Sequence, residues 1–421
     1  MVLRRQSCRS CGSRALTEVL SLGEQCIASN FSISADFPPI ERRIPLELVR
    51  CDPSLDEQAC GLVQLRHTVP GDLMYASYGY RSGINEGMVR HLRDLAHTME
   101  KRVGLAPDDL VVDIGANDGT LLRHYESKGI QRIGFEPSDI DPPEPIADVS
   151  FIKDYFSAAA LRAQIEKQKA RIVTSIAMFY DLEEPNRFVA DVAAILADDG
   201  LWAIELSYLP SMLDLASFDT ICHEHLEYYA LGSLEHLLHK HGLVVADAEL
   251  NDTNGGSIRV YVCHAGARHS VRTHEARVRL YALKKRECEI KLDRDEPYAR
   301  FANRIEKVRN DLNVLLSDLK RAGKRVYGYG ASTKGNVILQ YAGITTKQVD
   351  AIADRNPAKW GSTTPGSGIP IISEEEMRKA SPDYLLALPW HFMKGFQERE
   401  ADFVARGGKF IVPLPSPRIA P

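Results

Sequence analysis

The stretch Val111-Val112-Asp113-Ile114-Gly115-Ala116-Asn117-Asp118-Gly119-Thr120 decides how the rest of the chain is interpreted. It predicts a buried strand that runs into a tight glycine turn, followed by a helix that begins near Thr120. Gly115 and Gly119 have no Cβ, so the backbone can pass close to a ligand. A second strand at 133–135 ends in Glu136, and an acidic residue at about twenty residues' distance suits the two hydroxyls of a ribose. The alternative is an ordinary strand, turn and helix with glycines.

The glycine turn does not have the G-x-G-x-x-G order of dinucleotide-binding proteins. Its pattern of a hydrophobic residue followed by Asp-Ile-Gly-x-Asn-Asp-Gly resembles motif I of S-adenosylmethionine-dependent methyltransferases. The resemblance implies that the cofactor contacts residues of this turn and the acid after the second strand. These residues are Asp113, Gly115, Asn117, Asp118 and Glu136.

Asp154 lies where a third strand of the same sheet should end. In a methyltransferase fold a carboxylate at this place can accept a hydrogen bond from the adenine amino group. A helical pattern follows at 158–169, so Asp154 could equally be the N-cap of that helix. The sequence leaves both interpretations open.

Length and composition indicate a globular protein with several domains. The chain has 421 residues, 44% of them hydrophobic and 26% charged, with a net charge of −5. Its length predicts about two to four domains, and its charge does not favour nucleic acid or an anionic membrane as a partner. No apolar run approaches ~18 residues and no N-terminal apolar segment is present, so we expect neither a membrane span nor a signal peptide. We expect a cytoplasmic location.

Clustered cysteines in the first part of the chain predict a metal site. Cys8 and Cys11 form a C-x-x-C knuckle, and Cys51 and Cys60 follow at a wider spacing. Two such pairs can hold a structural Zn²⁺ ion in a closed tetrahedral site, which leaves no open position for chemistry. The alternative is four unrelated reduced cysteines.

Strands alternate with helices after the glycine turn, which predicts an α/β fold with a mostly parallel sheet covered on both faces. A helix is expected at 185–197 and a turn at 198–200 before the next strand. Tyr180 and Asp181 follow the buried strand at 172–177, and ligands bind at the carboxyl ends of such strands.

Polar side chains are concentrated at 218–229, around the triplet His223-Glu224-His225. The two histidines are two residues apart, which does not match the H-E-x-x-H helix of zinc proteases. An imidazole supplies a general base near neutral pH, and a neighbouring carboxylate can orient it. Metal binding is the second interpretation and polar packing the third.

A second strand, glycine turn and helix occur at 325–336, and this turn contains Lys334. Backbone amides at a helix N-terminus together with one ammonium group make an anion site. The pattern is not a Walker A motif, and close packing of helix on strand is the alternative. Further strands predict a second doubly wound domain, with a second candidate turn at Asp354.

Taken together, these motifs resemble the nucleotide-sugar C-methyltransferases of deoxysugar biosynthesis. The resemblance covers nearly the whole chain and includes Tyr-x-Tyr-x-Ser, His-Glu-His-Leu-x-Tyr-Tyr, Gly-Gly-Ser-x-Arg-Val-Tyr and Tyr-Gly-Tyr-Gly-Ala-Ser-Thr-Lys-Gly-Asn. It implies a zinc-binding domain at 1–70, a class I S-adenosylmethionine domain at 71–265, a helical connector at 266–322 and a Rossmann-like domain at 323–421. We expect the charges of the connector to be mostly solvated.

The resemblance also implies a mechanism. His225 would remove a proton next to a ketone of a nucleotide-diphosphate sugar, with Glu224 beside it, and the enolate carbon would take the methyl group. Tyr78 or Tyr80 would assist through its phenol. The sugar nucleotide would lie between the lobes, near Tyr180, Asp181, Cys222, His223, Ser332, Lys334 and Asn336.

Two departures from the family pattern fall where the sugar would lie. Members often have Tyr where this chain has Cys222, and Asn-Asn-x-x-x-His where this chain has Ile176-Ala177-Met178-Phe179-Tyr180-Asp181. O-methylation of a nucleotide sugar and a zinc-bearing binding module without catalysis are the alternative functions. A monomer is compatible with the sequence.

Overall fold

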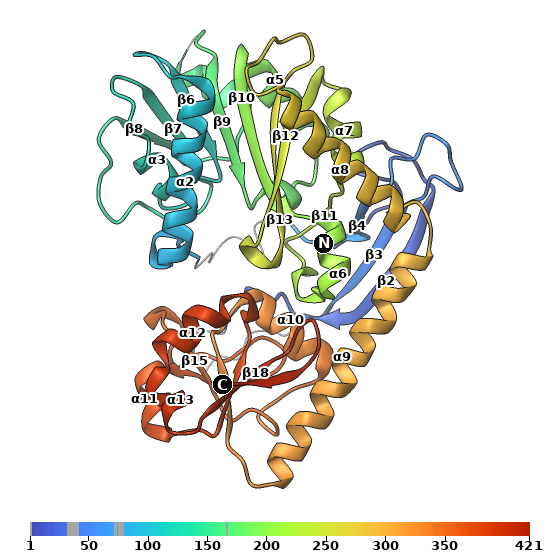
Figure 1. Cartoon of the computed structure of the whole chain (residues 1–421), viewed down its shortest axis with the longest axis vertical. Helices are drawn as coiled ribbons and strands as arrows, with labels where there is room; N and C mark the ends of the chain where they lie inside the picture. The colour runs from blue at the N-terminus through green and yellow to red at the C-terminus, as the bar shows by residue number, and fades with distance from the viewer. Residues whose placement is uncertain (1, 32–41, 71–73, 75–79, 166) are drawn as a thin grey trace.

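The described part of the chain forms three larger β-sheets and one two-stranded sheet, with helices around them (Figure 1). The computed structural model describes residues 2–31, 42–70, 74, 80–165 and 167–421. Within these ranges, no helix has the length and apolar character that crossing a membrane requires.

The first sheet is antiparallel and includes a strand from far along the chain. Its order is β11-β4-β3-β2, and a separate short pair joins β1 to β5. Because β11 follows the His-Glu-His triplet, this sheet fixes one end of that segment. The bounds are β1 Leu3–Arg4, β2 Leu16–Gln25, β3 Ile44–Cys51, β4 Val63–Leu65, β5 His67–Thr68 and β11 Glu227–Tyr228.

The central sheet contains the glycine turn and has seven strands in the order β12-β13-β10-β9-β6-β7-β8. All neighbours run parallel except β13, which is antiparallel to both β10 and β12. The order reverses between β6 and β9, and ligands bind outside the carboxyl ends of strands at such a point. The bounds are β6 Leu110–Ile114, β7 Gln131–Phe135, β8 Val149–Ile152, β9 Ala170–Ile176, β10 Leu196–Ser207, β12 Leu243–Asn251 and β13 Ser257–His264.

Helices cover both faces of the central sheet, as the alternation predicts. Apolar residues of α2 and α3 pack on one face in a cluster with Val111, Ile172 and Ala203. Residues of α4, α5 and α7 pack on the other face with Val112 and Val173. The bounds are α2 Glu86–Val103, α3 Thr120–Arg123, α4 Ala158–Gln164, α5 Pro185–Ile195, α6 Leu209–Leu215 and α7 Leu231–His239.

The expected turn at 198–200 lies inside a strand. Helix α5 ends at Ile195, and β10 already begins at Leu196, where it pairs with Ala170 before the register shifts at Leu201. The polar residues Asp198 and Asp199 therefore belong to an irregular strand end.

The last sheet is a second doubly wound unit with the order β16-β15-β14-β17-β18-β19, parallel except for β19. Its first strand in the chain, β14, is central, so a second reversal point lies between β14 and β17. The bounds are β14 Val326–Tyr329, β15 Ile352–Asp354, β16 Ile371–Ser373, β17 Tyr384–Ala387, β18 Lys409–Val412, β19 Arg418–Ala420, α10 Thr333–Ala342, α11 Glu374–Ala380, α12 Met393–Arg399 and α13 Ala401–Ala405.

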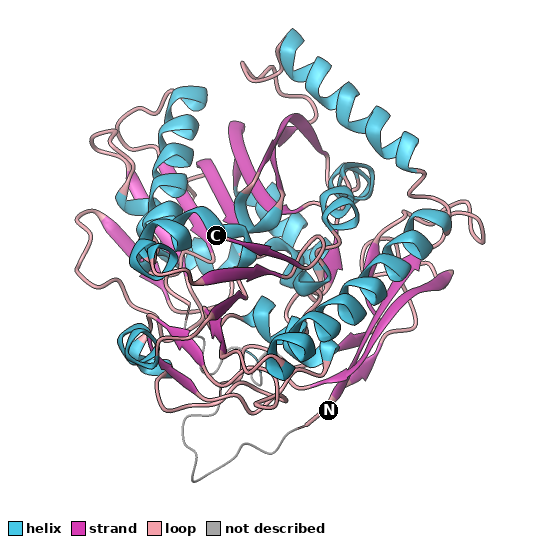
Figure 2. Ribbon diagram, turned by 60° about the horizontal axis from the view of Figure 1, so that its bottom comes forward, coloured by secondary structure: helices cyan, strands magenta, loops and turns pink. Residues whose placement is uncertain are grey.

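Two long helices, α8 His274–Ile290 and α9 Glu296–Arg321, connect the central and last sheets. Helix α9 lies beside the first sheet and reaches the last one (Figure 1, Figure 2). Its charges face outward, but a stripe that includes Phe301, Ile305 and Leu312 is buried. This stripe belongs to a hydrophobic cluster that also contains residues of the first sheet, of the segment at 209–230 after β10, and of the last sheet. Helix α9 therefore packs against these parts of the protein as well as connecting the central and last sheets.

Candidate active site

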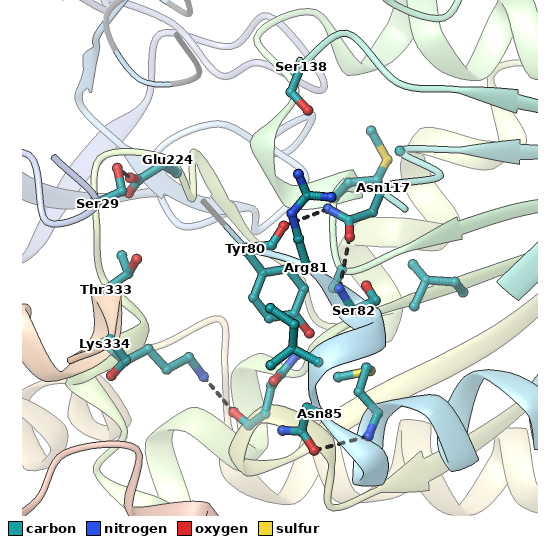
Figure 3. A pocket seen from close by; sticks show the side chains of 18 of the residues that line it. Ser29, Tyr80, Arg81, Ser82, Asn85, Asn117, Ser138, Glu224, Thr333 and Lys334 are labelled. Carbon is teal, nitrogen blue, oxygen red and sulfur yellow. Dashed lines mark hydrogen bonds between the residues drawn. The ribbon is translucent and has the colours of Figure 1, made fainter. Parts of the chain in front are cut away.

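A cavity of about 1850 Å³ opens between the central and the last sheet. Its walls come from the carboxyl ends of the central strands, the His-Glu-His segment and the glycine turn of the last sheet. Figure 3 shows Asn117, Glu224 and Lys334 around the same space. Among the predicted site residues, those that line it are Tyr80, Asp113, Gly115, Asn117, Glu136, Asp154, Tyr180, Asp181, Glu224, His225, Ser332 and Lys334.

The motif I turn forms one end of the cavity. Gly115 has φ +75°, and a Cβ there would meet the Met178 side chain at 3.0 Å. The Asn117 N–H donates to Oε2 of Glu136 at 2.8 Å, which joins the turn to the acid after β7. Glu136 also accepts from the Ser138 N–H at 3.0 Å. The adjacent strands β6 and β7 thus end at the cavity, where Gly115 presents backbone and Glu136 presents a carboxylate.

Asp113 is buried behind the turn at the end of β6. Its carboxyl group accepts from Oγ1 of Thr174 at 2.5 Å, and burial raises its pKa to about 7. Asp113 therefore joins β6 to β9 beneath the cavity floor.

Asp118 does not line the cavity among the described residues. Its carboxylate accepts from the Gly83 N–H at 2.8 Å and from Oγ1 of Thr120 at 2.6 Å. The Asn117 amide accepts from the Ser82 N–H at 2.9 Å and donates to the Tyr80 carbonyl at 3.0 Å (Figure 3). The motif therefore holds the segment at 80–83 over the cavity, a contact that the sequence did not predict.

Asp154 lines the cavity and is exposed, and its carboxylate accepts from the Tyr155 N–H at 2.7 Å. The N-cap of α4 is Ser157, whose hydroxyl accepts from the Ala160 N–H at 3.1 Å. The capping alternative for Asp154 is therefore wrong, because the helix begins later than Asp154 allows.

Hydrogen bonds on both sides fix the His-Glu-His segment. The Leu65 N–H of β4 donates to the Leu226 carbonyl at 2.8 Å, and the Leu226 N–H donates to the Tyr180 carbonyl at 2.7 Å. One bond comes from the first sheet and the other from the loop after β9. The segment is thus held between two sheets.

His225 lines the cavity with a neutral imidazole. Its Nδ1 lies 2.7 Å from the Thr220 carbonyl oxygen, which can only accept, so Nδ1 carries the proton and Nε2 keeps its lone pair. Burial lowers the pKa of His225 to about 4. The ring of Tyr180 packs against the imidazole with centroids 4.3 Å apart.

Glu224 lies beside His225 and is 5% exposed. Oε1 accepts a hydrogen bond from the Ser29 hydroxyl (Figure 3), and Oε2 is buried without a partner among the residues described. A buried oxygen of this kind is suited to receive a donor from a ligand.

His223 and Cys222 are placed differently from their neighbours. Nε2 of His223 donates to the Ile44 carbonyl of β3 at 3.1 Å, and its side chain is 1% exposed. Cys222 is fully buried in the hydrophobic cluster of the first sheet and α9, where burial raises the pKa of its thiol. In this structure both residues pack against other parts of the protein and do not line the cavity.

The second glycine turn forms the opposite wall. The Ser332 hydroxyl caps α10 by accepting from the Gly335 N–H at 3.0 Å, and Nζ of Lys334 donates to the Asn254 carbonyl at 2.6 Å. Asp354 at the end of β15 accepts from the Ala331 N–H at 2.7 Å. Helix N-terminus, ammonium group and carboxylate therefore meet at one edge of the last sheet.

Asn336 lies one turn into α10 and is fully buried. Its amide donates to the Ala28 carbonyl at 2.7 Å, so it joins the last unit to the first one and does not line the cavity. Tyr80 lines the cavity and is 46% exposed, whereas Tyr78 lies outside the described residues. The sequence did not single out Lys359 or His391, which also line the cavity, because neither lies in a recognisable motif.

Four thiols meet beside the first sheet, and Cys8 and Cys51 belong to the hydrophobic cluster that contains residues of α5 and α7. The sulfurs of Cys8, Cys11, Cys51 and Cys60 all lie within 4.8 Å of one another. Cys8 and Cys60 are 3.5 Å apart and Cys11 and Cys51 3.3 Å, close to the ~3.8 Å between sulfurs around a tetrahedral Zn²⁺. The donor set fits zinc, and none of these cysteines lines the cavity among the residues described.

The fold and the site define an S-adenosylmethionine-dependent methyltransferase that carries a structural zinc site. Three family models match successive parts of the chain: "Putative zinc binding domain" at 8–75, "Methyltransferase domain" at 84–248 and "C-methyltransferase C-terminal domain" at 252–415. The chain is 33% identical over 419 residues to the C-methyltransferase NovU of Streptomyces niveus, covering 98% of this chain and 96% of that protein. It therefore belongs to this family of C-methyltransferases.

Solved structures with a similar part include the magnesium protoporphyrin IX methyltransferase ChlM of Synechocystis PCC 6803 with bound SAH. Its TM-score is 0.32 at 15% identity, covering 42% of this chain and 84% of that one. A 1,6-didemethyltoxoflavin-N1-methyltransferase of Burkholderia thailandensis has a TM-score of 0.31 at 13% identity, covering 41% of this chain and 77% of that one.

Proposed function

We propose that this methyltransferase acts at carbon on a nucleotide-activated keto-deoxysugar. The observation that carries the proposal is a single cavity in which the motif I turn, a neutral imidazole and an anion-suited helix N-terminus all face one space. Such a space suits a substrate that has both a reacting carbon and a diphosphate. The motifs quoted above for the nucleotide-sugar C-methyltransferases support the same substrate.

The motif I end of the cavity would hold the methyl donor. Gly115 offers backbone without a side chain, and Glu136, which the Asn117 N–H holds in place, offers a carboxylate for the ribose hydroxyls. Asp154 would accept from the adenine amino group at the end of β8. When bound, S-adenosylmethionine supplies an electrophilic methyl group on a sulfonium.

His225 would be the general base. Its Nε2 keeps a lone pair because Nδ1 is committed to the Thr220 carbonyl, and burial keeps the ring neutral near neutral pH. A ketone next to the target carbon makes the C–H bond more acidic, and a neutral imidazole has the lone pair that accepts its proton. Glu224 would orient the sugar through Oε2, which has no partner among the residues that the structure describes, and Tyr80 would contact the keto oxygen.

The second glycine turn would bind the diphosphate. The amides at the start of α10 and the ammonium of Lys334 are directed to the same wall, and Lys359 lies near Asp354 at 3.9 Å. Positive groups and N–H donors at a helix N-terminus bind phosphates. Asp354 would then contact a hydroxyl of the nucleoside.

These roles support the division of the chain into zinc-binding, donor-binding, connecting and nucleotide-binding domains at 1–70, 71–265, 266–322 and 323–421. They also support a cytoplasmic location, because the zinc-binding thiols must stay reduced.

A methyl-transfer assay tests the proposal. The protein is incubated with methyl-labelled S-adenosylmethionine and thymidine diphosphate-4-keto-6-deoxyglucose, and in parallel with the same nucleotide sugar reduced to the 4-hydroxyl. Label should enter only the keto sugar and resist mild hydrolysis as a carbon-bound methyl. Equal labelling of the reduced sugar would contradict carbon methylation, because no enolate can form there.

A further inference from the structure

The carboxyl group of Asp181 lies in the cavity wall next to the segment that carries His225. Asp181 ends a short 3₁₀ helix, Phe179–Asp181, directly after β9. Its neighbour Tyr180 packs against the His225 ring and accepts the Leu226 N–H at 2.7 Å. Asp181 and the base are therefore held on two segments that are hydrogen-bonded to each other.

The surroundings of Asp181 are acidic and apolar. Its Oδ1 is buried and has no hydrogen-bond partner in the part of the chain that the structure describes. The carboxyl groups that act on it are those of Glu224 and Glu227, and burial also raises the pKa of Glu227 well above its ordinary value, while Cys222 and Tyr228 add groups that are neutral at neutral pH. Lys334 acts on His225 and on Asp219, not on Asp181.

Burial and the like charges together raise the pKa of Asp181 well above its ordinary value. A carboxyl group with a raised pKa stays protonated until the pH exceeds that value. The protonated form has an O–H donor, which a carboxylate lacks. Burial lowers the pKa of His225, so a neutral acid and a neutral base line the same cavity.

We propose that Asp181, in its neutral acid form, donates a hydrogen bond to the ketone oxygen of the substrate while His225 removes the proton from the adjacent carbon. This inference rests on the proposed function. The C–H bond breaks and its proton goes to Nε2 of His225. The C–H electron pair becomes the C=C bond, and the carbonyl π pair moves onto oxygen, where the Asp181 O–H stabilises the charge.

The resemblance predicts histidine at the place of Asp181, and Asp181 is where this chain departs from it. A histidine can donate a hydrogen bond at any pH through its N–H, but an aspartic acid can do so only while it is protonated. Burial of Asp181 meets that requirement, and the nearby carboxyl groups of Glu224 and Glu227 add to it because they oppose a further negative charge. The departure is therefore compatible with the same chemistry and makes the reaction sensitive to alkaline pH.

Solvent exchange at the carbon next to the ketone tests Asp181 separately from methyl transfer. The whole protein with S-adenosylhomocysteine and thymidine diphosphate-4-keto-6-deoxyglucose in deuterated water is followed by proton NMR. Asp181→Ala should slow exchange on the order of 100-fold, as the loss of one buried oxyanion donor does. Asp181→Asn keeps an N–H donor and should retain at least about a tenth of the rate. Asp318→Asn on the outer side of α9 should leave the rate unchanged.

The pH profile gives the second readout. The wild-type exchange rate should fall at alkaline pH as Asp181 ionises, and Asp181→Asn should lack that fall because an amide does not titrate. A wild-type rate in Asp181→Ala, or the same alkaline fall in Asp181→Asn, would overturn the inference alone. A wild-type protein that neither exchanges nor methylates the keto sugar would overturn the proposed function and this inference with it.

Discussion

At the scale of single residues, the central feature is an imidazole whose protonation is fixed by its surroundings. The Thr220 carbonyl fixes the tautomer of His225, and burial lowers its pKa to about 4. An exposed histidine has a pKa of about 6.5, so this one remains neutral over a wider acidic range. The Nε2 atom of His225 therefore keeps its lone pair without a partner that must first remove a proton.

The lowered pKa predicts the acidic side of the pH profile. His225 acts as a base only when it is neutral, so kcat/KM should rise as the pH passes about 4 and be level above it up to the alkaline fall. Initial rates measured from pH 4 to 9, with folding checked at each pH by circular dichroism, show where kcat/KM rises. A rise centred near about 6.5 would mean that the imidazole titrates as an exposed one.

We predict that Lys334 contributes binding energy for the diphosphate of the sugar nucleotide. Its Nζ donates to the Asn254 carbonyl at 2.6 Å and faces the cavity. Lys334→Met should raise KM for the sugar nucleotide roughly 10- to 100-fold, because a hydrogen bond to a charged group contributes about 1.5–3 kcal/mol. Lys347→Met, on an exposed loop after α10, is the matched control and should leave KM unchanged. Equal KM values in both variants would remove Lys334 from the site.

At the scale of elements, the site depends on strand ends and on turns that only glycine fits. β6, β7 and β9 bring Gly115, Glu136 and Asp181 to one edge because parallel neighbours end together. The short strand β11 does something different: it pairs with β4 of the first sheet and fixes the segment with His225. His225 is thus positioned by a sheet to which most of the central unit does not belong.

Substitution of Gly119 tests whether the motif I turn requires a residue without a side chain. It has φ +74°, and a Cβ there would come within 2.6 Å of Cδ1 of Ile146 and 2.8 Å of Cζ of Phe151. Gly119→Ala should lower the free energy of unfolding by at least about 1–3 kcal/mol, the cost of a left-handed conformation in a residue with a side chain. Gly266→Ala, where a Cβ meets nothing within 4 Å, should change it by less than about 0.5 kcal/mol. Urea unfolding measures both, and similar values would show that the turn tolerates a side chain.

Much of the element pattern could be predicted from the sequence, and the exceptions have physical causes. The strand, glycine turn and helix at 111–120 and at 325–336 were confirmed, because buried apolar runs next to glycines are local signals. The predicted end of α5 was two residues too late, because β10 already begins at Leu196, where it pairs with β9. The pairing of β11 with β4 was not predicted, because a two-residue strand has no pattern and its partner is far along the chain.

At the scale of the whole molecule, the cavity exists only because several units are packed against one another. Helix α9 and the first sheet share a hydrophobic cluster with the last sheet, and Asn336 joins α10 to Ala28. Two predicted site residues, His223 and Asn336, support this packing. Sequence motifs mark which residues a family shares, but they do not separate those that face a ligand from those that hold the units together.

The zinc site should affect the distant cavity through the first sheet. Cys51 ends β3 and Cys60 lies shortly before β4, which pairs with β11. Cys60→Ser should release zinc, lower the free energy of unfolding by more than roughly 3 kcal/mol and reduce activity. Cys288→Ser, at an exposed cysteine outside the cluster, is the control and should change stability by less than about 0.5 kcal/mol. Zinc content, thermal melts and turnover are compared; full activity of a zinc-free variant would contradict the coupling.

The central claim is that His225 removes a proton from the carbon that is methylated, and solvent exchange tests it most directly. His225→Gln and wild-type protein are each incubated with S-adenosylhomocysteine and thymidine diphosphate-4-keto-6-deoxyglucose in deuterated water, and binding of S-adenosylhomocysteine is measured in parallel by calorimetry. The wild type should incorporate deuterium next to the ketone. His225→Gln should bind S-adenosylhomocysteine as tightly and lose at least about 100-fold in exchange rate. Exchange at the wild-type rate in His225→Gln would show that another group is the base.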